Sequence, residues 1–391
     1  MLTVLFGNIV TPFEIRENAG LVIENGRIST VDTISGLQNL IDRVPNFQVY
    51  NFGHDLIMPG LIDLHVHGCA AGDVMDGSLE SMKALTQTAL TGGATGLLLT
   101  TRTSSIEHLT DVLHAMGALV DSDADRAARV LGFHVEGPFI NPKRAGGQPR
   151  QFACSPDLGL VESIVEAGKG RIRIMTLAPE LPNGLPVVKY LVDQGITASL
   201  GHSDATYEEA VSAINHGLSH FTHAFNAMPP LHHRTPGALA AGLLHPRVTA
   251  ELIADGIHVH PAVLELVYKL KGPDRIALVT DSTAAGLAPG RYTRAGRELV
   301  VDDRTVRLPD GTLAGSKLLL NNALKVCVQE ARIPLCDAVR MASTTPARVL
   351  GMGNKKGALL AGFDADVTVL SRDFSVRAVM VGGQFRFQRG E

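Results

Sequence analysis

Several patterns that would assign a chain to a specialised class are missing from these 391 residues. There is no run of lysine and arginine, and the formal net charge is -4, so no basic field is offered to nucleic acid. No window approaches the roughly 18 uninterrupted apolar residues of a membrane span. The N-terminus lacks the basic segment and long apolar core of a signal peptide. We therefore expect a soluble protein with neither nucleic-acid nor membrane partners.

Cysteine is also scarce. The four residues Cys69, Cys154, Cys327 and Cys336 show no CxxC spacing and are too few for a dense disulfide framework. Reduced thiols in a cytoplasmic protein are expected instead. A composition of 45% hydrophobic, 19% charged and 5% aromatic residues is typical of a globular chain and excludes a disordered one.

Both ends of the chain have the texture of short β-strands. Residues 2–6 are rich in strand formers, and Asn25-Gly26 is a strong hairpin signal. Residues 365–370 repeat the pattern near the other end. Neither end could bury a core alone, so we predict one small β-sandwich domain formed by residues 1–55 together with 356–391.

Between these ends, apolar strand-like runs alternate with helix-length amphipathic segments, which indicates βα units in the α/β class. Eight runs are centred on Leu61, Leu97, Val135, Ile174, Ala198, Phe221, Leu252 and Leu278. Eight strands in about 300 residues predict a (β/α)8 TIM-like barrel over residues 56–355. We also predict an inserted hairpin over 292–313, followed by helices over 317–331 and 335–350.

Polar residues that suit a metal ion lie at the ends of five of these runs: His65, His67, Glu136, His202, His223 and Asp281. Parallel strands of a barrel open their C-terminal ends onto one face, so these side chains are expected to converge. His65 and His67 stand two residues apart, which places both on the same face of a strand. His220 is three residues from His223 and is expected to pack on the opposite face, while His134 is expected to be structural.

The residue types indicate the chemistry. Glu136 has two oxygens and can bridge two cations, and Asp281 could complete a metal shell and act as a general base. Bound metal lowers the pKa of water from about 15.7 to about 7, and a nearby carboxylate can then carry its proton to a leaving amine. Nitrogen and oxygen ligands without thiolate favour Zn²⁺, with Fe²⁺, Mn²⁺ or Co²⁺ as alternatives, at one or two ions per subunit.

A proline-stiffened loop, residues 226–234, follows the sixth run and ends in His232-His233-Arg234. Arginine can hold a phosphate bidentately, and backbone N–H groups can add donors. The alternative interpretation is an ordinary solvated loop.

These residues resemble the motifs of the N-acetylglucosamine-6-phosphate deacetylases of the amidohydrolase superfamily. The matching segments are Pro59 to Gly68, His134 to Phe139, Gly201-His202-Ser203, Thr222 to Met228, Ala254 to Val259, Thr280-Asp281-Ser282 and Thr312 to Ser316. The resemblance implies that Glu136, His202 and His223 hold one ion, that His65 and His67 form a second site with Glu136, and that Asp281 is the catalytic acid/base. It implies a phosphorylated amino sugar bound by Gly147, Gln148, Asn226, Ala227, Arg234, His258, Leu313, Ala314 and Gly315. Arg234 could come from a neighbouring subunit, which favours a homodimer or higher homo-oligomer.

The sequence departs from the family pattern at one place. Where the family usually shows Lys-Gly-x-His, this chain has Arg144-Ala145-Gly146-Gly147-Gln148, and Gln148 cannot carry charge. The main hypothesis is therefore a metal-dependent deacetylase of N-acetylglucosamine 6-phosphate, with N-acetylgalactosamine 6-phosphate or another N-acyl amino sugar as the alternative substrate. A catalytically silent barrel is the hypothesis from another class, and the retained ligand set argues against it.

Overall fold

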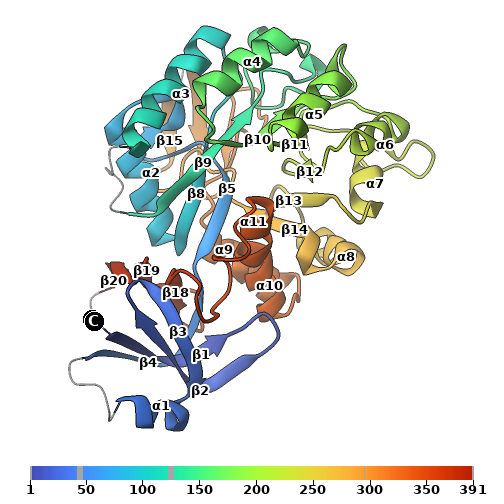
Figure 1. Cartoon of the computed structure of the whole chain (residues 1–391). Helices are drawn as coiled ribbons and strands as arrows, with labels where there is room; N and C mark the ends of the chain where they lie inside the picture. Colours follow the sequence, from blue (N-terminus) through green and yellow to red (C-terminus); the bar gives the residue numbers. More distant parts are fainter. Residues whose placement is uncertain (1, 42–46, 122–126, 295, 390–391) are drawn as a thin grey trace.

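The computed structural model describes residues 2–41, 47–121, 127–294 and 296–389, and its largest part is a barrel of eight parallel strands (Figure 1). The strands lie in the order of the sequence and are β5 (Leu61–Val66), β8 (Ala94–Thr100), β9 (Arg129–Glu136), β10 (Ile172–Leu177), β11 (Thr197–Leu200), β12 (His220–Phe221), β13 (Thr249–Ile253) and β14 (Ile276–Val279). Each contains one of the eight predicted centres. The predicted α/β barrel is therefore confirmed.

Helices separate successive strands and cover the outside of the barrel. They are α2 (Leu79–Thr91), α3 (Ile106–Asp121), α4 (Leu158–Ala167), α5 (Gly184–Asp193), α6 (Tyr207–Asn215), α7 (Gly237–Leu244) and α8 (Pro261–Lys271). Side chains fix several helix starts. Ser78 and Asp157 cap α2 and α4, and α6 begins with a capping box between Thr206 and Glu209.

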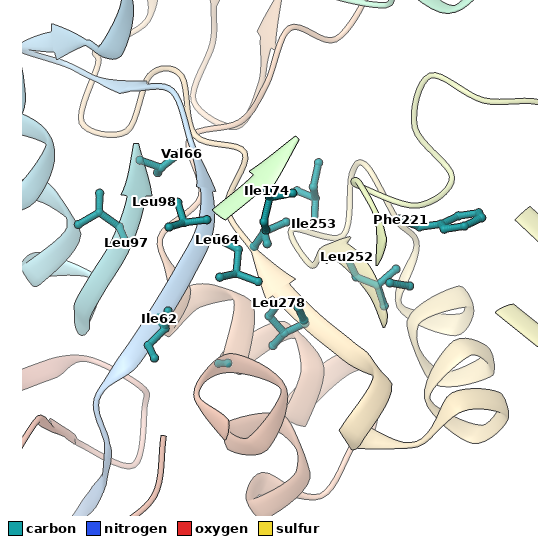
Figure 2. Packing of buried hydrophobic residues seen from close by; sticks show 14 of the residues in the cluster. Ile62, Leu64, Val66, Leu97, Leu98, Ile174, Phe221, Leu252, Ile253 and Leu278 are labelled. Atoms are coloured by element: carbon teal, nitrogen blue, oxygen red, sulfur yellow. The ribbon is translucent and has the colours of Figure 1, made fainter. Parts of the chain in front are cut away.

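Both sides of the barrel strands are buried, because helices cover the outer face and side chains fill the interior. Figure 2 shows this packing around Leu64, Leu98, Ile174 and Leu278. Phe221 instead packs against α7, where a Cβ added to Gly242 would lie 2.5 Å from the Phe221 ring. The absence of a side chain at Gly242 therefore lets this helix approach β12 closely.

Strands from both ends of the chain form one continuous seven-stranded sheet below the barrel in Figure 1. Its order is β20 (Gln384–Gln388), β19 (Val376–Val381), β18 (Val367–Leu370), β4 (Phe47–Pro59), β1 (Leu2–Val10), β2 (Ile15–Glu24) and β3 (Arg27–Thr33). A short helix, α1 (Ile34–Ile41), follows β3. The two-residue turn at Asn25-Gly26 has φ values of 51° and 76°, as an Asn-Gly hairpin requires. The predicted union of the two ends is confirmed, while the domain boundaries at residues 55 and 356 stay a prediction.

The segment after β14 differs in part from the prediction. The inserted hairpin is present as β15 (Gly290–Arg294), β16 (Arg297–Val301) and the short β17 (Val306–Arg307). The first predicted helix is shorter and mixed, with α9 (Leu320–Lys325) leading into a π-helix over Val326–Glu330. The prediction of one continuous second helix over 335–350 is wrong. The helix is broken at Ser343 into α10 (Leu335–Ala342) and α11 (Thr344–Val349), because Pro346 has no N–H to continue the helical ladder.

Two very short strands, β6 (Gly68–Cys69) and β7 (Gly72–Asp73), form a small turn directly after His67. In the described ranges, no helix has both the length and the apolar character needed to cross a membrane.

Candidate metal centre and its cavity

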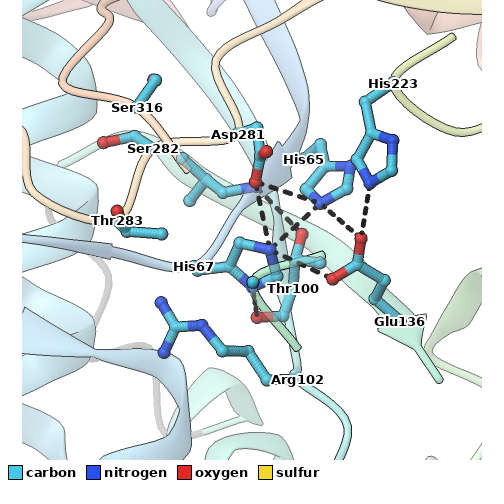
Figure 3. Close-up of polar contacts among 12 residues, drawn as sticks. His65, His67, Thr100, Arg102, Glu136, His223, Asp281, Ser282, Thr283 and Ser316 are labelled. Atoms are coloured by element: carbon cyan, nitrogen blue, oxygen red, sulfur yellow. Dashed lines mark hydrogen bonds and ion pairs between the residues drawn. The ribbon is translucent and has the colours of Figure 1, made fainter. Parts of the chain in front are cut away.

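All six predicted metal-compatible side chains meet at the C-terminal mouth of the barrel. Figure 3 shows His65, His67, Glu136, His223 and Asp281 pointing toward one another. Glu136 is the last residue of β9, and the others lie within or just after their strands. All six are buried, with exposed fractions between 0% and 9%. The convergence expected from the strand ends is therefore present.

The backbone at three of these residues is strained. His202, His223 and Asp281 have φ values of 49°, 29° and 46°, in the left-handed region that side chains with a Cβ rarely adopt. Each such residue costs on the order of 1–3 kcal/mol. The chain turns sharply at these strand ends and directs the side chains into the barrel mouth. The strained backbone lowers the folding stability at the positions of the candidate ligands.

One group of candidate ligands consists of Glu136, His202 and His223. Glu136 Oε1 lies 3.1 Å from His202 Nε2 and 3.0 Å from His223 Nε2, and the two Nε2 atoms are 3.1 Å apart. The Nδ1 of His202 lies 2.9 Å from the carbonyl of Arg144. A carbonyl only accepts, so Nδ1 of His202 carries the hydrogen and its Nε2 presents a lone pair to the centre.

A second group consists of His65, His67 and Asp281. Asp281 Oδ1 lies 3.5 Å from His65 Nε2 and 3.2 Å from His67 Nε2. The Nδ1 of His67 lies 3.1 Å from the carbonyl of Thr100, so His67 also presents a lone pair at Nε2. Its Nε2 faces that of His65 at 3.1 Å. Imidazole nitrogens that present lone pairs to each other at this distance repel unless a cation lies between them. The close Nε2 atoms of His65 and His67, and those of His202 and His223, therefore fit a divalent metal.

Glu136 connects the two groups. Its Oε1 lies 3.5 Å from His65 Nε2 and its Oε2 lies 3.3 Å from His67 Nε2. Burial acts to raise the pKa of Glu136, but the imidazoles of His202 and His65 lower it well below its ordinary value. The carboxylate is therefore ionised and has one oxygen near each group. This geometry can serve one ion or a bridged pair.

The charges around His65 also call for a cation. Burial alone would lower the pKa of His65, but Glu136, Glu251 and Asp281 raise it to about 10. Three buried carboxylates around one imidazole require positive charge to be stable in a low-dielectric site. A divalent metal supplies that charge.

Glu251 on β13 was not identified from the sequence, although it organises the centre. Its Oε2 accepts from His65 Nδ1 at 3.0 Å and from the His223 backbone N–H at 3.1 Å, and its Oε1 accepts from His220 Nε2 at 3.0 Å. Opposing charges on His65 and His220 hold the pKa of Glu251 well below its usual range against the effect of burial. A carboxylate behind a ligand histidine fixes its tautomer and orientation. Its only sequence signal was a charged residue inside an otherwise apolar strand.

His220 corrects a prediction. It was expected to pack outward, yet its side chain is fully buried and faces the barrel interior at Glu251. The expectation assumed strand alternation up to His223, but β12 ends at Phe221 and the backbone then turns. The nitrogens of His134 lie 3.1 Å from the Leu64 carbonyl and 2.7 Å from Thr176 Oγ1, which supports its structural interpretation.

Asp63 joins the first and last strands beneath the centre. It accepts from Thr280 Oγ1 at 2.6 Å and from the backbone N–H groups of His65 and Thr280 at 3.2 Å each. Burial raises the pKa of Asp63 to about 6 despite these bonds. The Asp281 N–H also donates to the His65 carbonyl at 2.9 Å. These contacts set the position of Asp281 relative to His65.

A cavity of about 220 Å³ opens over the centre. It is lined by His67, Glu136, His202, His223 and Asp281, and by eight of the nine predicted substrate-binding residues, Gly147, Gln148, Asn226, Ala227, His258, Leu313, Ala314 and Gly315. The remaining one, Arg234, is exposed, with its Nη1 2.9 Å from His233 Nε2, and does not line the cavity.

Two glycines allow the cavity wall to close. A Cβ on Gly147 would lie 3.1 Å from the Ala314 Cα, and one on Gly315 would lie 2.9 Å from the Asp281 carbonyl oxygen. Gly315 also has a φ of 79°. The segment 313–315 therefore packs directly on the backbone of the candidate acid/base.

Two arginines in this cavity were not predicted. Arg102 is almost fully buried and ion-paired to Asp73, and this pairing lowers the pKa of Asp73 against the effect of burial. Arg297, from the inserted hairpin, donates to the Gly147 carbonyl, and its buried Nε has no partner among the described residues. Burial lowers the pKa of Arg297 to about 10, so it remains a cation at neutral pH. Neither arginine belongs to a motif, which is why the sequence did not indicate them.

Gln148 lines the cavity, and its side-chain amide is held by protein groups. Its Oε1 accepts from the Thr103 N–H at 3.1 Å, and its Nε2 donates to Glu136 Oε2. His258 is also held, because Asp255 Oδ2 lies 2.7 Å from its Nδ1 and Asp255 Oδ1 accepts from its backbone N–H at 2.8 Å. This leaves the Nε2 of His258 free to face a ligand.

Comparisons with known proteins agree with this geometry. The model of the amidohydrolase family matches residues 56–386. An N-acetylglucosamine-6-phosphate deacetylase of Bacillus subtilis is 35% identical, with 97% of this chain and 95% of that protein covered. An N-acetylgalactosamine-6-phosphate deacetylase of Escherichia coli is 34% identical over 84% of this chain and 87% of its own length. The solved N-acetyl-D-glucosamine-6-phosphate deacetylase of Mycobacterium smegmatis, in complex with N-acetyl-D-glucosamine-6-phosphate, is 31% identical with a TM-score of 0.90 and covers 99% and 100% of the two chains. The chain is a metal-dependent amidohydrolase and belongs to the family of the N-acetylglucosamine-6-phosphate deacetylases.

Proposed function

We propose that this protein hydrolyses N-acetyl-D-glucosamine 6-phosphate to D-glucosamine 6-phosphate and acetate. The observation that carries the proposal is the convergence of six buried donor side chains in one cavity, together with the family's activity. Most of the matching relatives carry the N-acetylglucosamine name, so the N-acetylgalactosamine alternative is not favoured.

Glu136, His202 and His223 would hold one metal ion, and His65 and His67 would hold a second together with Glu136. Asp281 would complete the shell. His202 and His67 each present a lone pair at Nε2, 3.1 Å from the Nε2 of a second imidazole, and these contacts support the assignment. A divalent cation, with Zn²⁺ favoured by the nitrogen and oxygen ligands, lowers the pKa of a coordinated water and polarises the amide carbonyl.

Asp281 would move the proton. Burial acts to raise its pKa, but the imidazoles of His65 and His67 lower it, so the carboxylate is ionised and can accept. Its Oδ takes a proton from the attacking water and delivers it to the amide nitrogen as the carbon–nitrogen bond breaks. The products are acetate and the free amine, so atoms and charge balance.

The other wall would bind the sugar phosphate. Asn226, the Ala227 backbone and the free Nε2 of His258 face the cavity and offer hydrogen bonds to phosphate oxygens. Arg234 lies outside its own cavity, which supports its reaching the site of a neighbouring subunit in a homodimer or higher homo-oligomer. Free thiols at all four cysteines support the expected cytoplasmic location.

Acetate release from metal-loaded protein tests the proposal. N-acetylglucosamine 6-phosphate is compared with N-acetylgalactosamine 6-phosphate and with unphosphorylated N-acetylglucosamine. We expect the first to give the highest kcat/KM, exhaustive chelation to abolish turnover, and Asp281→Asn to lower kcat by roughly 10²–10⁴-fold. Full activity in Asp281→Asn would remove the assigned role, and preference for the galacto epimer would replace the substrate.

A further inference from the structure

A second cavity, of about 180 Å³, opens at the opposite end of the barrel from the metal centre. It lies at the N-terminal ends of β11 to β14 and beside α11, and we call it the basal cavity. Its wall includes Thr197, Ser219, Thr249, Arg247, Arg275 and Arg348. Its volume is close to the 220 Å³ of the catalytic cavity. It therefore has room for a ligand of similar size to a phosphorylated sugar.

The basal cavity carries excess positive charge. Among the described residues, neither Arg247 nor Arg275 has a carboxylate within ion-pair distance. Asp274 is the one acidic residue in the wall, and two arginines already share it. Arg348 lies 3.2 Å from its Oδ1, and Arg340 lies 2.7 Å from its Oδ2. Two guanidinium groups are thus left without a counter-charge, and a guanidinium fork matches the oxygens of a phosphate.

Hydroxyl groups complete a set of donors suited to an anion. The side chains of Thr197, Ser219 and Thr249 line the cavity, and in the described ranges none makes a hydrogen bond to another protein group. A hydroxyl can donate to a phosphate oxygen at the same place where arginine supplies charge. Thr345, by contrast, is already used, because its Oγ1 donates to the Pro273 carbonyl at 2.8 Å.

His220 forms part of the same wall, and its Nδ1 is buried without a partner in the described part of the chain. Its Nε2 is already used, because it donates to Glu251 Oε1 at 3.0 Å. The Nδ1 atom has almost no accessible surface, so the donors that a ligand meets in the basal cavity are the arginines and the hydroxyl groups.

We propose that the basal cavity is a second ligand site that binds a phosphate group, carried by inorganic phosphate or by a small phosphate ester. Arg247 and Arg275 hold the phosphate, with Thr197, Ser219 and Thr249 donating to its oxygens. This site shares no residue with the catalytic cavity, so the proposal stands or falls independently of the deacetylase assignment.

The test compares two double variants with the same loss of charge. Arg247→Gln with Arg275→Gln removes the unpaired guanidiniums of the basal cavity. Arg372→Gln with Arg386→Gln removes two exposed arginines, one in the loop between β18 and β19 and one on β20, that have no ion pair among the described residues. Metal-loaded wild type and both variants are titrated calorimetrically with inorganic phosphate and, separately, with glucose 6-phosphate. Any binding in the catalytic cavity is common to all three proteins and cancels in the comparison.

We expect one binding event to weaken at least tenfold in Arg247→Gln/Arg275→Gln and to remain in the control, with acetate release in low-phosphate buffer unchanged in both. A loss seen only with glucose 6-phosphate identifies the ligand as an ester, and a loss with both probes identifies the phosphate group alone as sufficient. Equal affinities in all three proteins would overturn the proposal. Arg247→Gln alone, at an exposed position, gives the same readout if the double variant does not fold.

Discussion

The two walls of the catalytic cavity are built differently. The wall of strand ends carries His65, His67, Glu136 and Asp281, all buried and held by contacts from neighbouring strands. The wall of loops carries Asn226 and Ala227, which are half-buried, and it leaves Arg234 outside. The difference supports a division of labour in which the barrel positions the hydrolytic residues, and in which we propose that the loops bind the substrate.

If the strand wall depends on Glu251, removing its charge should produce the largest effect on metal binding. In the wild-type protein both carboxylate oxygens of Glu251 accept hydrogen bonds. In Glu251→Gln an NH₂ group replaces one of these oxygens, so one amide N–H would face a histidine N–H. We expect metal affinity to fall by about 10–100-fold. Metal content is measured after dialysis against graded chelator.

Glu265→Gln is the matched control, since Glu265 pairs with Lys269 on the surface of α8. It should retain metal like the wild type. Equal metal retention in Glu251→Gln and Glu265→Gln would show that the histidines hold their orientation without the Glu251 carboxylate.

The loop wall should respond through substrate binding instead. If Arg234 binds the substrate phosphate as proposed, Arg234→Gln removes that charge-assisted contact, and we expect KM to rise about tenfold with kcat nearly kept. Kinetics over a range of substrate concentrations separate the two constants.

Mixing subunits sharpens this prediction. Asp281→Asn subunits retain Arg234, and Arg234→Gln subunits retain Asp281, so a mixed dimer contains one complete site if the arginine crosses the interface. Mixed samples should recover low-KM activity that neither variant shows alone. If mixing recovers nothing, Arg234 serves its own chain or no site at all.

The smallest effect is expected at Gln148, which joins the two walls. Gln148→Ala removes the bonds to Glu136 and to the Thr103 N–H, and we expect acetate release to fall about fivefold. Gln148→His keeps one donor and one acceptor and should recover part of the loss. If Gln148→Ala behaves as wild type, Gln148 does not position Glu136. The same variants are scored on both sugar epimers to show whether this residue affects specificity.

The strand wall could be predicted from the sequence because it follows from periodicity. Apolar runs located the eight strands, and a polar residue at the end of a run can only point into the barrel mouth. His65 and His67 needed nothing more than the two-residue repeat of a strand. The resemblance to a family then supplied the loop positions such as Asn226 and His258, which periodicity could not supply.

Other features depend on contacts that the sequence does not reveal. Glu251 is a single acidic residue within a strand, and only the barrel's closure brings it behind His65. Arg297 reaches the cavity from a hairpin inserted after the last strand, so its distance in sequence from Gly147 concealed the contact. The amphipathic pattern over residues 335–350 predicted one continuous helix, whereas Pro346 causes a break at Ser343.

The junction between β4 and β5 has a consequence for how the protein is made. β4 ends at Pro59 and β5 begins at Leu61, and the short step between them is clamped by β18, where Pro59 pairs with Val367 and the Gly60 N–H donates to Asp366. The strand that bears His65 is therefore secured at its base by residues that leave the ribosome long after it does. A nascent chain with a finished barrel still lacks that clamp, so its centre gains full rigidity only when residues 366–370 have been translated.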